Sequence, residues 1–151
     1  MYVLFKIINE FYILPIEHVR EVIKTTSISP LPKAPYFVEG IATVREHNIL
    51  VINLFKKLTL KTQLEPKNEY FIIISIKNMI FALLVDKVLD IISVESFNED
   101  ISSKEIQLMS SDVVEKIIPY KKNRLFLLNA AKLIDSDEEF KLTELNRQHE
   151  N

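Results

Sequence analysis

The sequence predicts a mainly β protein made of two copies of one small strand unit. Three observations lead to this prediction: short apolar runs rich in β-branched and aromatic residues, asparagines placed between them, and a pattern that repeats at an offset of 69 residues. None of the runs is long enough for a solitary buried helix, and their composition favours strands. The six predicted strands are Tyr2–Ile8, Phe11–Ile16, Ile49–Phe55, Tyr70–Ile76, Met79–Val85 and Leu125–Leu128.

Asparagine is expected to form the turns between these strands. The chain has one glycine, Gly40, so the residue that adopts the left-handed backbone of a tight turn most easily is nearly absent. Asparagine is the next most tolerant residue. The turns are therefore predicted at Asn9, Asn48, Asn78 and Asn123.

The repeat covers most of the predicted strands. Residues 2–23 lie over residues 71–92 without a gap, and their asparagine turns coincide. Few positions are identical, so the repeat is carried by the order of aliphatic, acidic and basic-type residues. Further along, residues 48–58 match residues 123–133 in the same way. Two copies in a chain of one domain's length predict twin subdomains that share a core.

The remaining segments are predicted to be connections. Residues 27–35 contain three prolines, which fix φ and remove amide donors, so this segment is expected to be extended and ordered. Tyr36–Gly40 is predicted to form one helical turn after Pro35. Residues 62–69 and 96–112 are polar and are expected to be loops.

The end of the chain changes in composition. From Asn129 onward, alanine, lysine, leucine and acidic residues predominate, which predicts a strand end followed by an amphipathic helix. The last six residues are expected to be frayed.

Composition excludes several classes of protein. The 151 residues are 48% hydrophobic and 26% charged, with a net charge of −2 and no cysteine. The lack of cysteine removes disulfides, thiolate catalysis and cysteine-bound metals. A single glycine cannot form the glycine-rich loops that bind nucleotides. No stretch approaches the roughly 18 apolar residues of a membrane span, and no signal peptide is recognised, so a cytoplasmic protein is expected.

We find no catalytic apparatus, metal site or cofactor site in the sequence. The three histidines lie apart, without metal-ligand spacing. Four acidic residues recur at matching positions of the repeat and could act as paired acid and base, but they are explained more simply as polar positions of a repeated strand edge. These acidic residues are Glu17, Glu21, Asp86 and Asp90.

Two basic clusters leave a second function open, that of a small nucleic-acid-binding β-barrel. No aromatic stripe accompanies them, and the low net charge argues against a phosphate-backbone ligand. They are therefore better explained as solvated strand ends. The clusters consist of Lys56, Lys57 and Lys61, and of Lys121, Lys122 and Arg124.

The order of motifs resembles the CheW-like domain family. Residues 15–23 resemble the family's PIxxVxEVI motif, and residues 29–40 resemble its proline-spaced xPLPxAPxxVxG motif. Residues 85–92 resemble the VDxVxxVI motif of the second half, and residues 127–134 its closing LLDxxKLL motif. The resemblance covers about residues 2–134 in the correct order.

This resemblance implies a fold of two SH3-like, five-stranded β-barrel subdomains with a C-terminal helix. We expect a single domain over residues 1–140, with subdomain 1 at about 11–68 and subdomain 2 at about 69–134 plus the N-terminal strand 2–8. Residues 141–151 would be the end of the helix and a frayed tail. Stand-alone family members are chemotaxis adaptors of two-component systems. They couple chemoreceptor tips to the regulatory domain of the histidine kinase CheA, in arrays at the membrane and without inserting into it.

The resemblance also implies partner-binding residues. Glu21 and Arg45 fall on an acid and an arginine that mark the receptor- and kinase-facing region and can pair with each other. Val19 and Val22 flank that acid, and Gly40 falls on the glycine that precedes the arginine strand.

Four family positions differ in this chain. The glycine after the arginine is Glu46 here, so the turn must be built differently, with Asn48 predicted to take the positive φ. The aspartate of the family's PVxDL motif is replaced by Asn53, and its proline is also lost. Lys116 stands where the second half usually has glycine.

Overall fold

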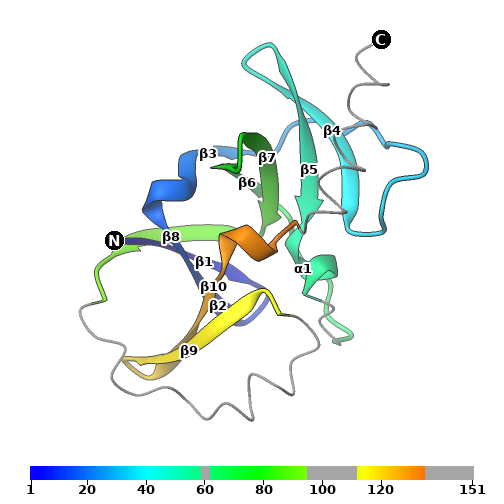
Figure 1. Ribbon diagram of the computed structural model, residues 1–151. Helices are drawn as coiled ribbons and strands as arrows, with labels where there is room; N and C mark the ends of the chain where they lie inside the picture. The colour runs from blue at the N-terminus through cyan, green and yellow to red at the C-terminus, as the bar shows by residue number, and fades with distance from the viewer. Residues whose placement is uncertain (59–61, 95–111, 135–151) are drawn as a thin grey trace.

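A computed structural model describes residues 1–58, 62–94 and 112–134 as two five-stranded sheets that lie side by side (Figure 1). Sheet A has the strand order β8 (Lys87–Ile92), β1 (Tyr2–Ile7), β2 (Glu10–Pro15), β10 (Asn123–Leu128) and β9 (Val114–Tyr120). Sheet B has the strand order β3 (Val19–Lys24), β6 (Tyr70–Ile76), β7 (Met79–Val85), β5 (His47–Asn53) and β4 (Val38–Val44). Three short helical segments are described: η1 (Ile16–His18), α1 (Leu54–Lys57) and η2 (Ala130–Lys132).

The six predicted strands are all present, and four more strands accompany them. All four are edge strands, and in β3 and β8 at least every second residue is exposed. These two strands therefore carry fewer consecutive apolar residues than the central strands, so no apolar run marks them in the sequence. The predicted helical turn at Tyr36–Gly40 is wrong, because Val38 already begins β4. The segment Val38–Val44 is rich in apolar residues and pairs along its length with β5.

The repeat is confirmed in the order of the strands. At the offset of 69, β1, β2 and β3 correspond to β6, β7 and β8. The hairpin β4–β5 corresponds to β9–β10, but at an offset of 76, because the two-residue loops 45–46 and 121–122 are equivalent. The match of residues 48–58 to 123–133 was therefore one residue out of register. In a strand such a slip moves each side chain to the opposite face.

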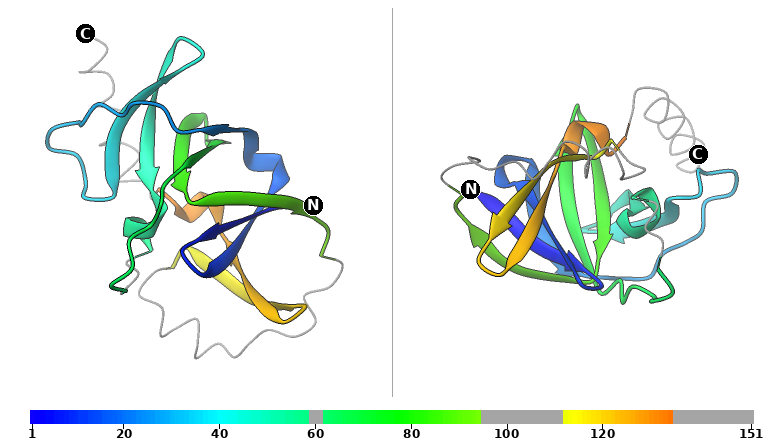
Figure 2. Two further views of the ribbon diagram at one scale, coloured as in Figure 1. Left: turned by 180° about the vertical axis from the view of Figure 1, so that it is seen from behind. Right: turned by 90° about the horizontal axis from the view of Figure 1, so that it is seen from below.

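The two repeats exchange their first hairpins. Sheet A combines β1 and β2 of the first repeat with β8, β9 and β10 of the second, and sheet B is the converse (Figure 2). The predicted subdomain boundary at residues 68 and 69 is therefore wrong for the strands. The N-terminal strand is predicted to join the second half, and β1 does lie in sheet A with strands of the second repeat. Strand β2 lies in the same sheet, because a hairpin with a two-residue loop keeps its two strands paired.

The four hairpin loops show where positive φ angles occur. Each loop has two residues, and the strand pairing places them at 8–9, 45–46, 77–78 and 121–122. Asn78 has φ of 62°, as predicted for a turn. Asn9 also lies in its predicted turn, but the positive φ of that loop falls on Ile8. The predictions for Asn48 and Asn123 are wrong, because the positive φ angles of those two loops fall on Arg45, Glu46 and Lys121. Asn48 and Asn123 already belong to strands, where extended backbone is required.

The sheets share one core. Side chains of both sheets pack into the largest buried cluster, which includes Phe5 and Tyr12 of sheet A and Ile72 and Phe81 of sheet B. The opposite face of each sheet packs into a smaller cluster of its own. The alternation of strand side chains sends successive residues to these two layers. The fold is thus held by contact between the sheets as well as within each of them.

Asp86 joins the two sheets at the point where the chain crosses between them. It is the only residue between β7 of sheet B and β8 of sheet A, and it is 4% exposed. Its carboxylate accepts hydrogen bonds from the backbone N–H of Ile8 at 2.6 Å and of Asn68 at 2.9 Å. Its own N–H donates to the carbonyl oxygen of Lys6 at 3.2 Å. One buried carboxylate therefore ties together the first hairpin, the 62–69 connection and the crossing.

The predicted C-terminal helix lies almost wholly outside the described residues. The chain leaves β10 through Asn129, whose side-chain oxygen accepts from the N–H of Ala131 at 3.0 Å and caps η2. Residues 135–151 are not described. In the described part of the chain, no helix has the length and apolar character needed to cross a bilayer.

Candidate partner-binding surface

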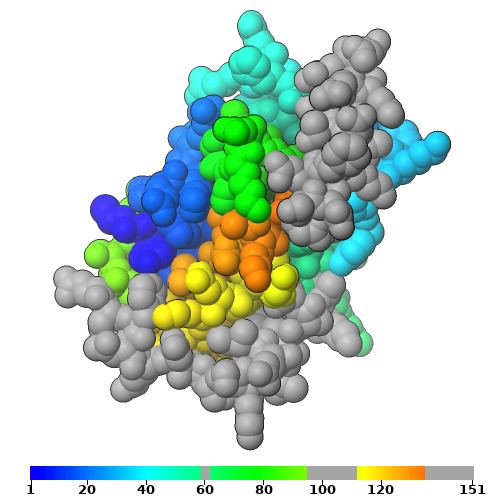
Figure 3. Space-filling view, in the orientation of Figure 1, coloured from blue at the N-terminus to red at the C-terminus, as the bar shows by residue number. Residues whose placement is uncertain are grey.

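The edge strands β3 and β8 form the two walls of an open groove of about 510 Å³. The strands belong to different sheets and lie beside each other near the N-terminus (Figures 1 and 3). Four of the lining apolar side chains are more than a third exposed. The groove is lined by Val3, Ile16, Val19, Arg20, Glu21, Val22, Val88, Leu89, Asp90 and Ile91.

A β-bulge in each wall gives the groove its dense lining. In a regular strand only alternate residues face one side, yet four consecutive residues of each strand line this groove. The pairing of β3 with β6 skips Arg20, and the pairing of β1 with β8 skips Leu89. These two residues are equivalent in the repeat. A bulge re-aims side chains and increases twist, which also blunts an exposed sheet edge against unspecific pairing.

The predicted pair Glu21 and Arg45 is formed. The guanidinium Nε of Arg45 donates to both carboxylate oxygens of Glu21, each at 3.0 Å. The side chain of Arg45 is 75% exposed and that of Glu21 is 29% exposed. An ion pair in this setting contributes only about 0–1 kcal/mol to stability. The contact orients Arg45 at the edge of the surface and does little to hold the fold.

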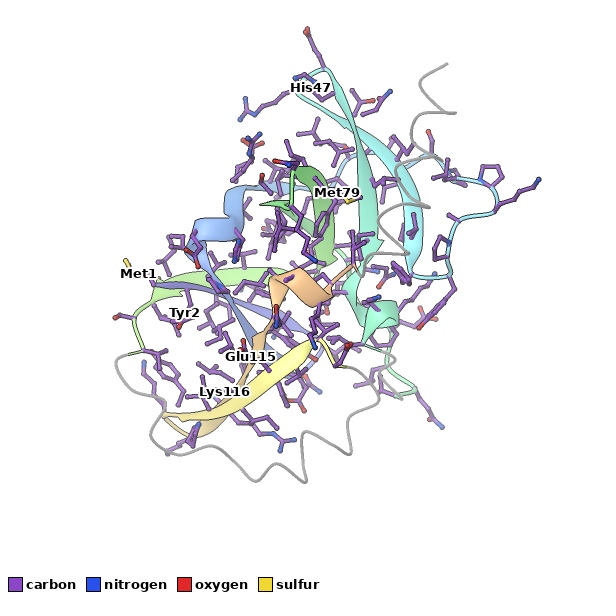
Figure 4. All side chains as sticks on the ribbon, in the orientation of Figure 1. Met1, Tyr2, His47, Met79, Glu115 and Lys116 are labelled. Atoms are coloured by element: carbon purple, nitrogen blue, oxygen red, sulfur yellow. The ribbon has the colours of Figure 1, made fainter. Side chains whose placement is uncertain are left out.

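The arginine stands on a strained turn beside a second hollow. Arg45 and Glu46 have φ of 49° and 68°, so both adopt the left-handed backbone of a two-residue hairpin loop. The adjoining hollow of about 490 Å³ has an apolar floor that includes the half-exposed Ile80. Arg20 and Glu21 line both this hollow and the groove. His47, which follows the loop at the tip of the same hairpin (Figure 4), also lines this hollow.

Gly40, which is predicted to be a partner-binding residue, has a packing role in the structure. Its φ is 146°, and a Cβ atom there would collide with the carbonyl oxygen of Ser29. Ser29 and Ile41 exchange two backbone hydrogen bonds of 2.8 Å across this close approach. Only glycine lets the proline-rich connection lie against β4 at this distance. Gly40 therefore shapes the edge of sheet B and presents no side chain to a partner.

Asn53 replaces the family's aspartate with a group that can both accept and donate. Its side-chain oxygen caps α1 by accepting from the N–H of Lys56 at 3.1 Å. Its Nδ2 donates to Glu39 at 2.7 Å, and the ammonium of Lys56 lies 2.8 Å from the same carboxylate oxygen. Burial alone would raise the pKa of Glu39, but the hydrogen bonds from Lys56 and Asn53 outweigh it and lower that pKa. An aspartate could not make the donor contact.

The basic clusters are partly engaged within the molecule. Lys56 pairs with Glu39, and Lys57 lies over the ring of Phe37 at 4.2 Å from its centroid. Lys121 and Arg124 lie over the rings of Tyr120 and Phe126 at 5.3 and 5.2 Å. Lys61 lies outside the described residues. Elsewhere in the described chain, no three histidine, aspartate or glutamate side chains converge as metal ligands would.

The sequence identified one wall of the groove and missed the other. Val19, Glu21 and Val22 all lie on β3, while Val88, Asp90 and Ile91 occupy the equivalent positions on β8. The offset of 69 residues marks Val88, Asp90 and Ile91 as equivalent positions. It does not show that both strands line one groove, because this depends on the exchange of hairpins, which is not visible in the sequence.

Two five-stranded sheets with exchanged hairpins define a duplicated β module, with an open apolar groove between two equivalent edge strands. A model of the CheW-like domain family matches residues 1–138. The chain therefore belongs to the CheW-like domain family.

Named relatives place this membership in context. The chemotaxis protein CheW of Treponema pallidum (strain Nichols) is 30% identical over 149 residues, covering 95% of this chain and 86% of that protein. CheW of Thermotoga maritima is 29% identical over 99 residues, covering 66% and 65%. The crystal structure of the scaffolding protein TtCheW from Thermoanaerobacter tengcongensis matches with a TM-score of 0.77 at 28% identity, covering 91% of this chain and 93% of that one.

Proposed function

We propose that this chain is a non-catalytic chemotaxis adaptor in the cytoplasm. It couples the helical tips of chemoreceptors to the regulatory domain of the histidine kinase CheA and helps to build the signalling array at the membrane. Membership of the CheW-like family and the likeness to a protein described as a scaffold support the adaptor role. The groove between β3 and β8 is the observation that carries the assignment of the receptor site.

The groove has the character of a site for a helical partner. Exposed Ile16, Val22, Leu89 and Ile91 offer apolar surface in one place, and amphipathic helices dock by laying an apolar face into such a groove. A single contact of this size is weak. In an array, many linked contacts hold the adaptor in place through avidity.

The kinase contact is assigned to the Arg45 side of sheet B. Arg45 is exposed, oriented by Glu21, and stands beside the hollow floored by Ile80. Such an arrangement suits a partner that brings an apolar side chain and an acidic group together. The nucleic-acid alternative has no comparable support, since four of its six basic residues contact acidic or aromatic neighbours in the chain.

The receptor site is tested by co-sedimentation with membranes that carry chemoreceptors. Ile91→Arg places a charge in the groove and is expected to abolish co-sedimentation. The matched control is Leu64→Arg, because Leu64 is 54% exposed but lies outside the groove. Equal loss or equal retention in the two variants would contradict the assignment of the groove.

The kinase site is tested by a pull-down of the CheA regulatory domain. Arg45→Ala should weaken capture and kinase activation, while its melting temperature stays nearly unchanged because the ion pair is exposed. Lys24→Ala removes an exposed cation at the far end of β3 and serves as the control. Undiminished capture by Arg45→Ala would move the kinase contact elsewhere, and failure of the unaltered protein to bind either partner would refute the adaptor role.

A further inference from the structure

The two strands that form the walls of the groove carry equivalent apolar residues. Val19 and Val22 on β3 have Val88 and Ile91 as their equivalents on β8, while Val3 and Ile16 line the groove from outside these strands. A helical hairpin presents two similar helices, so apolar contact alone would let it enter the groove in two orientations related by half a turn. An adaptor that joins specific partners in an array needs the hairpin to bind in a single one of these two orientations. The walls must then differ in something other than apolar surface.

Charge is the property in which the walls differ. Arg20, in the bulge of β3, is replaced by Leu89 in the bulge of β8. Arg20 is exposed and makes no ion pair with any residue in the described part of the chain. The carboxylate of Glu21 is neutralised by Arg45 at 3.0 Å. The β3 wall therefore presents one uncompensated positive charge.

The β8 wall presents the opposite charge. Asp90 is the equivalent of Glu21, and Lys121 is the equivalent of Arg45, with a similar φ of 54°. Unlike Arg45, Lys121 does not pair with the acid on the wall: its ammonium lies over the ring of Tyr120. The Oδ1 atom of Asp90 accepts only the neighbouring N–H of Ile91, at 2.7 Å, within the described residues. Asp90 thus remains a negative charge at the groove.

We propose that Arg20 and Asp90 fix the orientation in which a helical hairpin enters the groove. The hairpin that fits carries an acidic group on the side facing β3 and a basic group on the side facing β8. This inference rests on the proposed function, because it names the charge pattern of the partner at the receptor groove. Charges at the edge of an interface discriminate between arrangements more than they add affinity, since like charges brought together are unfavourable.

The decisive variant reverses the polarity of the groove without changing net charge. Arg20→Glu with Asp90→Lys exchanges the signs of the two walls, and both positions are exposed, so the fold should be kept. Each single variant creates one mismatch and is expected to weaken binding of a purified chemoreceptor signalling fragment about fivefold. The double variant is expected to recover most of that loss. Glu65→Lys with Lys67→Glu is the control, an exposed reversal outside the groove.

Orientation is read directly by cross-linking. The chain has no cysteine, so Lys24→Cys at the end of β3 provides a single reactive position beside one wall. In the otherwise unaltered protein it should cross-link to one helix of the receptor hairpin, and in the double variant to the other helix. Cross-linking to the same helix in both backgrounds, or single variants that bind as tightly as the control, would overturn the inference. Absence of binding by the unaltered protein would instead refute the proposed receptor site.

Discussion

The two repeats share a backbone but differ at the positions where one side chain decides the local structure. Gly40 has Lys116 as its equivalent, Asp86 has Glu17, Asn53 has Asn129, and Phe81 has Tyr12. In three of these pairs one member carries a contact that its partner lacks, and in the fourth one member carries a hydroxyl without a partner. The two copies thus keep the same strand order but differ in the side-chain contacts that stabilise it. Substitutions at equivalent positions should therefore have unequal effects.

The largest difference is expected for Gly40 and Lys116. Gly40→Ala should destabilise the protein by about 3 kcal/mol or more, because φ of 146° is strained for alanine and the Cβ meets the Ser29 carbonyl. Lys116→Ala at the equivalent place on β9 should cost less than about 1 kcal/mol. Chemical unfolding of both variants measures the difference. Similar costs would mean that the close approach to Ser29 does not constrain the fold.

The next difference separates Asp86 from Glu17. Asp86→Ala leaves the N–H groups of Ile8 and Asn68 without their acceptor and should cost about 2–3 kcal/mol. The side chain of Glu17 is 76% exposed, so Glu17→Ala should change stability by less than about 0.5 kcal/mol. Thermal unfolding of the pair provides the measurement. An equally mild effect at Asp86 would show that other contacts hold the crossing between the sheets.

The two helix caps are expected to differ in their response to a carboxylate. Asn53→Asp keeps the cap of α1, but it replaces the amide group that donates to Glu39 with a second carboxylate. The substitution should lower the stability of the protein by about 1–2 kcal/mol at pH 7. Asn129→Asp keeps its contact with the N–H of Ala131 and should be nearly neutral. Unfolding in denaturant at several pH values measures both.

The pH dependence of Asn53→Asp follows from the lowered pKa of Glu39. A lowered pKa in the folded state means that the contribution of Glu39 is present above the ordinary carboxyl pKa. It is lost as pH falls through the folded value. In acid, protonation of the two carboxylates also relieves their repulsion in the variant. The difference in unfolding free energy between Asn53→Asp and the unaltered protein should therefore become smaller. A gap that stays constant from pH 7 to pH 3 would contradict this account.

The smallest effect is expected to be a gain in stability. Tyr12 is fully buried between Phe5 and Phe126, and its hydroxyl has no hydrogen-bond partner among the described residues. Burial, together with the nearby Glu10 carboxylate, raises the pKa of Tyr12 far above its ordinary value. Tyr12→Phe gives this position the residue of its equivalent, Phe81, and should stabilise the protein by about 1 kcal/mol. A loss of stability on urea unfolding would indicate that the hydroxyl has a partner after all.

The sequence was informative where local chemistry decides and uninformative where distant strands meet. The central strands could be predicted because their apolar runs need burial on both faces, and the Glu21–Arg45 pair followed from the family resemblance. The wall formed by Val88, Leu89 and Ile91 could not be predicted, since its place beside β3 depends on the hairpin exchange. The role of Asn53 also required the structure, because only its distance to Glu39 shows why a donor is needed there.

The exchange of hairpins has a consequence for synthesis of the chain on the ribosome. The first hairpin, β1–β2, emerges early, yet its parallel neighbour β10 is the last of the described strands to be made. At roughly 5–20 residues per second, the hairpin must wait on the order of ten seconds before sheet A can close. Sheet B, by contrast, is complete once β7 has emerged. The edges of that first hairpin therefore stay unpaired for longer during synthesis than the edges of the strands in sheet B.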